Sequence, residues 1–442
     1  MIRLRRVHTL AAACAAASVL TTQQLQASGF AIPELSVLGL GTANALVANP
    51  DEPGALAYNP AAIAFHPKST WSAAVLFIDP YFSVRTANGK HDSQGADWHA
   101  LPLVNAAVRV DDKWALGISV NSPFGLETRW PAGTFPELTG TAPVNLGPPL
   151  GQVTLPVSAQ PTQSKAEILD FTPTITYAVN DQFSLAAGAD IYWAKSAKFS
   201  STLTSVEGDG TGWGFNLSAM YVKDALSLGI NFHSAATVSM DGYYTALNPT
   251  LAQIYQGTGG AQGIPPSQSA SLDLDLPWRL QLGVRYEITN ELAAEIDWTR
   301  TGWSEFKELS IDLQPDGNLV TDQNQWNDAN AYRLGITYQV RPNTQLRLGY
   351  SYDETPQPNK YFTARIPDSD RNLFSIGVAQ SFGQGWTAEL GYMYVMNEER
   401  NYKGTQPYVP GGPTNGTTAY AGKYKADANL IGLGISKRFD AF

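Results

Sequence analysis

The sequence predicts an all-β fold, a 14-stranded antiparallel transmembrane β-barrel with an N-terminal hatch, or plug, in its lumen. Only 15% of the 442 residues are charged, while glycine (39), tyrosine (20) and tryptophan (11) are plentiful. Beyond the N-terminus the longest unbroken apolar run is Ala73 to Ile78, far shorter than the roughly 20 residues of a membrane helix. About fourteen segments alternate apolar and polar residues, as barrel strands between lipid and lumen do.

Residues 1–27 have the features of a secretory signal peptide. Three arginines precede an apolar core from Leu10 to Leu20, and small residues lead to an expected cleavage after Ala27. The single cysteine, Cys14, lies inside this signal. The mature chain is therefore expected to have no disulfide and no thiolate chemistry.

The net charge argues against a nucleic-acid partner. The formal value is −10, and the signal carries three arginines and no acidic residue, so the mature chain is more acidic still. An acidic surface repels phosphate backbones, and no lysine- or arginine-rich run offsets it. No histidine pair has metal-ligand spacing and no glycine-rich phosphate loop follows a strand, so neither a metal nor a cofactor is expected.

The strand pattern is clearest at residues 279–298. Apolar residues from Leu280 to Ile288 occupy even positions, and after the turn at Thr289–Asn290 the same parity continues to Trp298. The pattern recurs over residues 104–120, 171–199, 213–232, 332–352 and 374–396, with a first strand near 71–85 and a last near 430–439. The total is an even number, as in single-chain bacterial barrels, so we assign the barrel to residues 71–442.

A soluble β-sandwich or propeller would produce the same alternation. Three features favour the membrane barrel: the signal peptide, the regular exchange of short turns with long loops, and aromatic residues near strand ends. Short turns then face the periplasm and long loops the cell exterior.

Residues 28–70 do not have a strand pattern and instead contain several glycines and prolines. A fourteen-stranded barrel is wide enough to leave a lumen that would leak solutes if it were empty. We therefore expect this segment to plug the lumen. A separate periplasmic appendage is disfavoured because the segment is too small to form its own core.

A series of short motifs extends in order over nearly the whole mature chain. They are Ser28-Gly29-Phe30, Gly39-Leu40-Gly41, Tyr58-Asn59-Pro60-Ala61, Phe77-Ile78-Asp79-Pro80, Ser122-Pro123-Phe124-Gly125-Leu126-Glu127-Thr128, Trp213-Gly214-Phe215-Asn216, Leu274-Asp275-Leu276-Pro277, Ala331-Tyr332-Arg333-Leu334, Asp353-Glu354-Thr355-Pro356-Gln357-Pro358 and Ile366-Pro367-Asp368-Ser369-Asp370-Arg371. With these motifs the chain resembles the long-chain fatty acid transporter (FadL) family of outer-membrane proteins, which includes aromatic hydrocarbon channels.

The resemblance implies passive uptake of long-chain fatty acids or similar hydrophobic compounds. Extracellular loops would capture the substrate, an internal site gated by the hatch would hold it, and a gap in the wall would release it sideways. The hatch and gating residues would be Ser28, Gly29, Asn59, Pro60 and Ala61. Phe30 would lie beside the internal site.

The third strand suggests where the wall opens. Its alternation from Trp114 to Val120 meets Pro123 and Gly125; proline cannot donate to the ladder and glycine permits a kink. We expect a lateral opening at Asn121, Ser122, Pro123, Phe124 and Gly125. The alternative is that the strand simply ends there in an extracellular loop.

The fifth strand supplies candidates for substrate binding. By parity Tyr192 and Lys198 face the lumen, whereas Lys195 faces lipid near the rim. Lys198-Phe199 also matches a basic-Phe pair of the family whose basic residue binds the substrate head group, so Lys198 is the candidate for a carboxylate. The alternative is an ordinary lumen charge paired with an acid.

Two departures from the family favour a neutral or aromatic substrate instead. The family's second head-group lysine has no counterpart in Gln323–Trp326, and the loop at about Ser200–Thr211 is short. The mixed charges of lumen parity elsewhere are expected to form a salt-bridged interior that anchors the plug.

Two other functions remain as alternatives. A general porin would fit the barrel but leave the hatch unexplained. A lipase-like hydrolase would need a serine, a histidine and an acid together; only His233 has lumen parity on a strand, and no G-x-S-x-G elbow exists. We therefore expect no catalytic residues and no enzyme.

The expected location is the outer membrane of a Gram-negative bacterium. The expected partners are a hydrophobic small molecule, outer-membrane lipid with lipopolysaccharide, and the barrel assembly machinery. The protein is expected to be a monomer.

Overall fold

The computed structural model describes residues 29–94, 98–145, 147–148, 151–156, 159–260, 263–314, 318–410 and 412–440. The predicted signal peptide and Ser28 lie outside the described residues. No helix within these ranges is long and apolar enough to cross a membrane.

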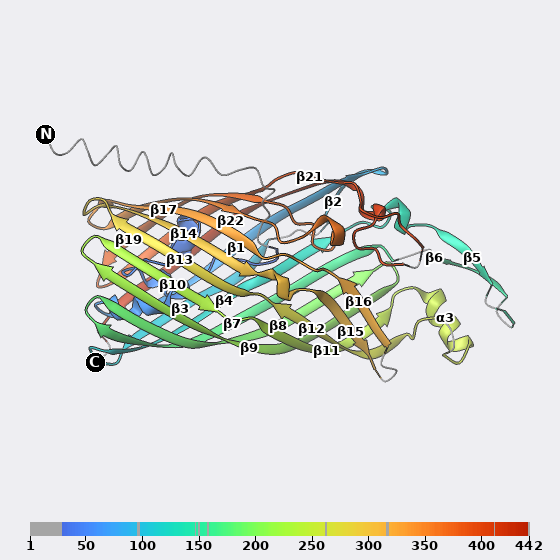
Figure 1. The fold of residues 1–442 in the computed structure, drawn as a ribbon, viewed down its shortest axis with the longest axis horizontal. Helices are drawn as coiled ribbons and strands as arrows, with labels where there is room; N and C mark the ends of the chain where they lie inside the picture. Colours follow the sequence, from blue (N-terminus) through green and yellow to red (C-terminus); the bar gives the residue numbers. More distant parts are fainter. Residues whose placement is uncertain are drawn as a thin grey trace.

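The described residues form a closed antiparallel barrel, which confirms the predicted fold class (Figure 1). Its wall has fourteen positions, where one position is either a single strand or two consecutive strands that lie end to end. The ring closes where the first strand, β1 (Ser69–Thr86), pairs with the last, β22 (Gly422–Phe439). Closure removes the free edges that an open sheet would expose. The last strand begins eight residues earlier than the alternation near residue 430 indicated.

Eight further wall positions are single strands. They are β3 (His99–Arg109), β4 (Trp114–Arg129), β7 (Pro161–Asn180), β8 (Phe183–Ser201), β9 (Thr204–Lys223), β18 (Thr344–Asp353), β19 (Arg371–Gly383) and β20 (Trp386–Asn397). The other four positions consist of two strands each: β10 (Leu226–His233) with β11 (Ala236–Ala246), β12 (Ser267–Leu276) with β13 (Trp278–Glu287), β14 (Leu292–Gly302) with β15 (Glu308–Leu313), and β16 (Asn318–Gln323) with β17 (Ala329–Arg341).

The breaks in these four positions lie side by side. His233 pairs with Arg279, Arg279 with Thr301, and Thr301 with Ala329, so the interruptions run across neighbouring strands. The short 3-10 helix η4 (Trp303–Glu305) fills one of them. Backbone that leaves the ladder at these points is free to direct side chains into the lumen.

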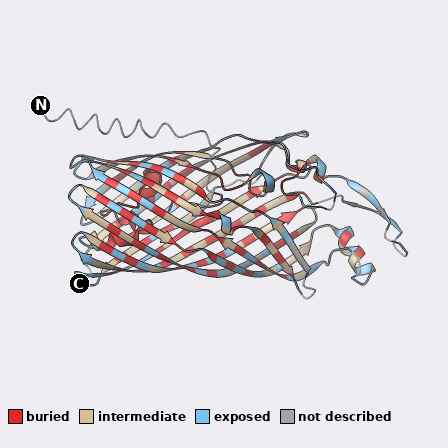
Figure 2. Cartoon of the chain, in the orientation of Figure 1, coloured by how far each residue is buried: buried red, intermediate tan, exposed pale blue. Residues whose placement is uncertain are grey.

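Burial alternates along the strands as the parity argument predicts (Figure 2). On β18, Leu346 and Leu348 are exposed on the outer face, while Arg347 between them is buried in the lumen. Arg347 Nη1 lies 2.6 Å from Glu389 Oε1 of β20. At this level of the barrel the lumen wall is therefore polar and paired, and the outer wall is apolar.

The two ends of the barrel differ (Figure 1). Tight turns of two to four residues join β3 to β4, β7 to β8, β9 to β10, β13 to β14, β17 to β18 and β19 to β20 at one end. The other end carries the longer connections, which contain β2 (Gly89–Asp92), η3 (Pro136–Leu138), the two-stranded sheet of β5 (Thr141–Asn145) and β6 (Gln152–Pro156), α3 (Pro249–Gly257), η5 (Asn359–Tyr361), β21 (Arg400–Tyr402) and η6 (Thr418–Tyr420). One connection there is tighter than predicted, because β8 and β9 are joined by residues 202–203 alone.

Residues 29–68, called here the N-terminal segment, pack inside the barrel. The segment contains α2 (Val37–Gly41), η1 (Pro53–Ala57) and η2 (Pro60–Phe65). Every residue from Glu34 to Pro50 is buried, and α2 contacts β18, β19, β20 and β22. The segment has one small hydrophobic cluster of its own, formed by Leu35, Leu38, Leu46, Ala57 and Tyr58. The surrounding barrel wall buries the rest of it.

Candidate functional site

Asn59, Pro60 and Ala61 tie the N-terminal segment to three neighbouring strands. Asn59 Nδ2 donates to the Ala219 carbonyl oxygen of β9 at 3.2 Å. Hydroxyl groups on β7 and β8 donate to the carbonyl oxygens of Pro60 at 3.0 Å and Ala61 at 2.8 Å. These contacts satisfy backbone groups that a buried loop would otherwise leave unpaired.

Two wall carboxylates hold a second part of the segment. Asp297 Oδ2 accepts hydrogen bonds from the backbone N–H groups of Leu46 at 2.7 Å and Val47 at 3.0 Å. Glu295 Oε1 accepts the next one, from Ala48 N at 2.6 Å. Hydrogen bonds to a carboxylate are about twice as strong as neutral ones, so β14 anchors this stretch firmly.

Lumen-facing glycines allow the segment to approach the wall closely. A Cβ atom at Gly229 would collide with the carbonyl oxygen of Val47, and one at Gly349 would collide with the backbone at Thr42. The absence of side chains at these strand positions brings backbone against backbone.

An aromatic cluster surrounds Phe30. Its members are Phe30, Phe124, Tyr192, Trp303, Phe306 and Trp326. The Phe30 ring centroid lies 4.7 Å from that of Trp303, 5.5 Å from Phe306 and 5.9 Å from both Phe124 and Trp326. Most of these rings meet edge to face, a favourable geometry for aromatic pairs. Phe30 thus packs between Phe124 of β4 and the aromatic residues that enter the lumen at the strand breaks.

The wall is unpaired between the outer parts of β3 and β4. Their ladder runs from Arg109 opposite Ala115 only to Val104 opposite Val120. Beyond that point β3 pairs with β1 alone, and β4 pairs with β7 alone through a bulge between Asn121 and Phe124. The kink was predicted at these residues, and the strand continues past it to Arg129 instead of ending in a loop.

The N-terminal segment covers part of the free edge of β4. Ile32 N donates to the Pro123 carbonyl oxygen at 2.8 Å, and Gly125 N donates to the Phe30 carbonyl oxygen at 3.0 Å. Ala31 and Phe124 form an isolated antiparallel bridge. Backbone groups at membrane depth need such partners, and here the plug supplies them in place of the neighbouring strand.

A cavity of about 570 Å³ passes through this gap. On the lumen side its walls include Phe30, Leu373 and Leu430. On the outer side they include Trp193 and Lys195, which alternate with the buried Tyr192 and Ala194 on β8. The volume is that of a small-molecule site, and its lining joins the lumen to the outer surface of the wall.

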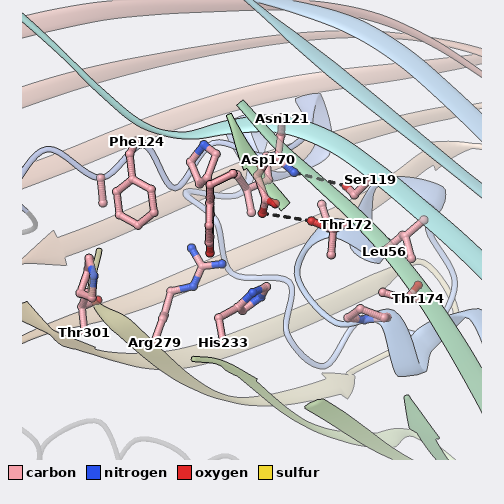
Figure 3. Close-up of a pocket in the computed structure, with 17 residues that line it drawn as sticks. Leu56, Ser119, Asn121, Phe124, Asp170, Thr172, Thr174, His233, Arg279 and Thr301 are labelled. Carbon is pink, nitrogen blue, oxygen red and sulfur yellow. Dashed lines mark hydrogen bonds between the residues drawn. The ribbon is translucent and has the colours of Figure 1, made fainter. Parts of the chain in front are cut away.

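A smaller chamber borders the aromatic cluster, with Phe124 and Tyr192 in its lining (Figure 3). Arg279 and His233 face Asp170 and Thr172 across it. Thr172 Oγ1 donates to Asp170 Oδ2 at 3.0 Å. The chamber holds about 30 Å³, space for a few waters and not for a whole substrate.

His233 is engaged on both ring nitrogens. Its Nδ1 lies 2.9 Å from Asp190 Oδ2, and its Nε2 lies 3.1 Å from Asn231 Nδ2. Among the hydrogen bonds of the described residues, none joins this ring to a serine hydroxyl. The arrangement is a structural network rather than the activated nucleophile that a hydrolase requires.

The predicted orientation of Lys198 is wrong. Lys195 and Ser196 together oppose the single residue Asp209 of β9, and this bulge inverts the alternation of β8 beyond Ala194. Ala197 therefore faces the lumen, while Lys198 points outward and its Nζ lies 2.8 Å from Glu207 Oε2. Lys198 does not line the large cavity.

Several charged residues that line the large cavity were not predicted. Arg371 lies beside the N-terminal segment, with Nη2 3.9 Å from Asp353 Oδ2. Asp368, in the connection after β18, accepts a hydrogen bond from Gly29 N at 3.1 Å, and burial raises the pKa of its carboxyl. The alternation of strand residues could not reveal Asp368 or Arg371, because Asp368 precedes β19 and Arg371 is its first residue. The only signal in the sequence was that both belong to Ile366–Arg371, one of the motifs that carry the family resemblance.

The sequence analysis also did not predict three residues of the aromatic cluster: Trp303, Phe306 and Trp326. They enter the lumen from interruptions in the β14–β15 and β16–β17 positions, where alternation stops. The one available signal was the pair of aromatic residues, Trp303 and Phe306, within four residues after Gly302.

Comparison with solved structures supports the fold. A Pseudomonas aeruginosa FadL homologue superposes with a TM-score of 0.75 at 22% identity, covering 93% of this chain and 100% of that one. The Pseudomonas putida toluene transporter TodX superposes with a TM-score of 0.66 at 14% identity, covering 95% and 100%.

Sequence comparison reaches the same family. A long-chain fatty acid transport protein of Escherichia coli O6:H1 is 25% identical over 97% of this chain and 98% of its own length. Outer membrane protein P1 of Haemophilus influenzae is 25% identical over 96% and 99%. The family model described as outer membrane protein transport protein (OMPP1/FadL/TodX) matches residues 18–142 and 142–439. With the barrel, these matches confirm the predicted resemblance, and this chain belongs to that family of outer-membrane transport channels, which are not enzymes.

Proposed function

We propose that this protein takes up long-chain fatty acids or similar hydrophobic compounds by diffusion and releases them sideways into the outer membrane. One observation carries the proposal: the cavity beside Phe30 continues to the outer face of the wall where β3 and β4 do not pair. A substrate in that cavity has a continuous route from lumen to bilayer, along which apolar side chains such as Phe30, Leu126 and Trp193 line the wall. It would never need to cross the polar, salt-bridged half of the lumen.

The N-terminal segment would act as the hatch, with residues 28–70 as one unit and 71–442 as the barrel. Ser28, Gly29, Asn59, Pro60 and Ala61 would serve the hatch and its gating. Asn59, Pro60 and Ala61 support this role by anchoring the segment, and Gly29 does so by its contact with Asp368. Movement of residues 29–32 would change access to the lateral opening at residues 121–125, because Phe30 and Ile32 bond to β4 there.

Phe30 and Tyr192 would border the internal binding site. Phe30 lines the large cavity and Tyr192 the smaller chamber, and both belong to the aromatic cluster. Capture would begin at the end of β11 and the loop that follows it, where Tyr243 of β11 and Leu247 of the loop are exposed.

A neutral or aromatic hydrocarbon is the second candidate substrate. The aromatic cluster favours this substrate. The similar proteins include one described as a long-chain fatty acid transport protein and one described as a toluene transporter, so both substrate classes occur among them. Mass spectrometry of hydrophobic ligands that co-purify with the protein, followed by uptake assays in a strain lacking it, would decide between them. A general porin is disfavoured because buried residues fill the lumen at the N-terminal segment.

The protein would work as a monomer, inserted by the barrel assembly machinery among outer-membrane lipids and lipopolysaccharide. The closed seam between β1 and β22 supports a self-sufficient barrel.

Gly125→Trp tests lateral release. A Cβ at this position would already lie 2.8 Å from Ile32 Cδ1, so an indole would obstruct the opening. We expect uptake to fall at least tenfold while heat-modifiable migration on gels shows a folded barrel. Leu116→Trp, on the exposed outer face of the same strand, is the control and should retain uptake. Full uptake by correctly inserted Gly125→Trp would rule out lateral release.

A further inference from the structure

A cluster of three charged residues lies on the outer wall beside the unpaired part of β4. Lys165 and Glu167 belong to β7, and Lys195 belongs to β8. Glu167 lies between the two lysines, with Oε1 2.8 Å from Lys165 Nζ and Oε2 3.5 Å from Lys195 Nζ. All three line the large cavity where it leaves the wall.

Charges are unusual on the lipid face of a barrel strand. Lysine or arginine there is strongly destabilising at the bilayer midplane and much less so near the interface. Trp193 precedes Lys195 on the same outer face, and tryptophan is enriched at membrane interfaces. The cluster therefore suits an interfacial position at the outer mouth of the opening.

Among the ion pairs of the described residues, the two lysines share the single carboxylate of Glu167, and the Lys195 side chain remains 62% exposed. Two other nearby acids are engaged elsewhere: Glu207 pairs with Lys198, and Glu127 pairs with Arg129 across a 2.5 Å contact. Asp209 of β9 lies opposite the bulge at Lys195, but within the described residues it forms no ion pair with Lys195. The mouth therefore offers an ammonium group to an incoming anion.

Apolar groups border the same cations. Leu169 and Trp193 line the cavity next to the lysines, and the lining continues inward to Gly125 and Leu126. A single ligand could thus place an apolar chain along the gap and an anionic group on the lysines.

We propose that Lys165 and Lys195 form an exit site that binds the ionised carboxylate of a long-chain fatty acid as it leaves through the opening. The inference rests on the proposed function and deepens it, because it assigns an anionic amphiphile as substrate. The carboxylate takes the place of Glu167 on one lysine, and the head group stays at the interface while the chain enters the bilayer. Charge-assisted hydrogen bonds give such a contact its strength.

The barrel contains a matched control cluster. Lys423 and Lys425 of β22 share Glu399, with Nζ to carboxylate distances of 2.8 Å and 3.0 Å. This second cluster has the same composition and does not line the cavity. Lys425 is as exposed as Lys195, whereas Lys423 is more exposed than Lys165.

The test compares two substrates of equal chain length in proteoliposomes that contain no lipopolysaccharide. Lys165→Gln/Lys195→Gln should lower protein-dependent transfer of oleate at least tenfold at pH 8, and transfer of oleyl alcohol by less than twofold. Lys423→Gln/Lys425→Gln should leave both rates unchanged. Lys165→Arg/Lys195→Arg keeps the charges and should restore oleate transfer, which guards against a folding defect.

Other results would overturn the exit site. Unchanged oleate transfer, or an equal loss with both substrates, would show that the lysines do not recognise the carboxylate. A defect seen only when lipopolysaccharide is added would assign the lysines to its phosphates. If the unaltered protein moves neither compound, the proposed function itself fails.

Discussion

Ile32 and Pro123 join the N-terminal segment to the barrel wall by a 2.8 Å hydrogen bond from the Ile32 N–H to the Pro123 carbonyl oxygen. Proline has no N–H of its own, so residue 123 can only accept. The kink in β4 thus turns its carbonyl toward the plug rather than toward β3. The same residue that interrupts the wall also links it to the N-terminal segment.

Ile32→Pro should loosen this link, because proline removes the donating N–H. Loss of one backbone hydrogen bond costs about 1 kcal/mol, or about fivefold in the opening equilibrium. We expect amide hydrogen exchange of Gly125 to rise by that factor, since its N–H bonds to the adjacent Phe30 carbonyl oxygen. Ile32→Val, which keeps the N–H, should leave exchange unaltered; equal protection in both variants would contradict the link.

Asp297→Asn should release part of the plug without unfolding the barrel. The neutral amide weakens the hydrogen bonds from Leu46 and Val47, and bonds to charged groups contribute about 1.5–3 kcal/mol. We expect faster proteolysis of residues 42–50 and greater leakage of small antibiotics into cells. Asp275→Asn, on the exposed side of β12, is the control; identical proteolysis of the two variants would show that Asp297 does not anchor the segment.

Lys198→Ala should barely affect fatty acid binding. Lys198 pairs with Glu207 on the outer face, and exposed ion pairs contribute at most about 1 kcal/mol. Equilibrium binding of a fluorescent fatty acid should change by less than twofold. A tenfold loss would restore Lys198 to the substrate site despite its outward position.

The connection between β18 and β19 should open as the pH rises. Burial raises the pKa of the Asp370 carboxyl to about 7, although Tyr352 Oη donates to it at 2.9 Å. Because this pKa lies above the unfolded value of 3.8, the folded state binds more protons between these values, and stability falls from about pH 4 to about pH 7. Limited proteolysis at residues 354–370 should therefore be faster at pH 8 than at pH 5. Asp370→Asn should remove most of the difference, and a persistent pH effect in that variant would exclude Asp370 as its cause.

The barrel could be predicted because its alternation is enforced by lipid on one side and a polar lumen on the other. The kink at Pro123 could also be predicted from the sequence, since proline and glycine change the local backbone whatever strand lies beside them. The error at Lys198 arose because a bulge depends on the partner strand: only the pairing with Asp209 shows that Lys195 and Ser196 share one position. Trp303 and Trp326 were missed for a similar reason, because interrupted strands lose the periodicity on which the prediction depended.

The seam between β1 and β22 has a consequence for the order of assembly. β22 is the last strand to be synthesised, so the ring cannot close until the chain is complete. The N-terminal segment contacts strands on opposite sides of the ring, with α2 against β20 and η2 against β9. Its full set of contacts therefore exists only after the seam has closed. Seam closure and packing of the segment are thus coupled steps of assembly, and each stabilises the product of the other.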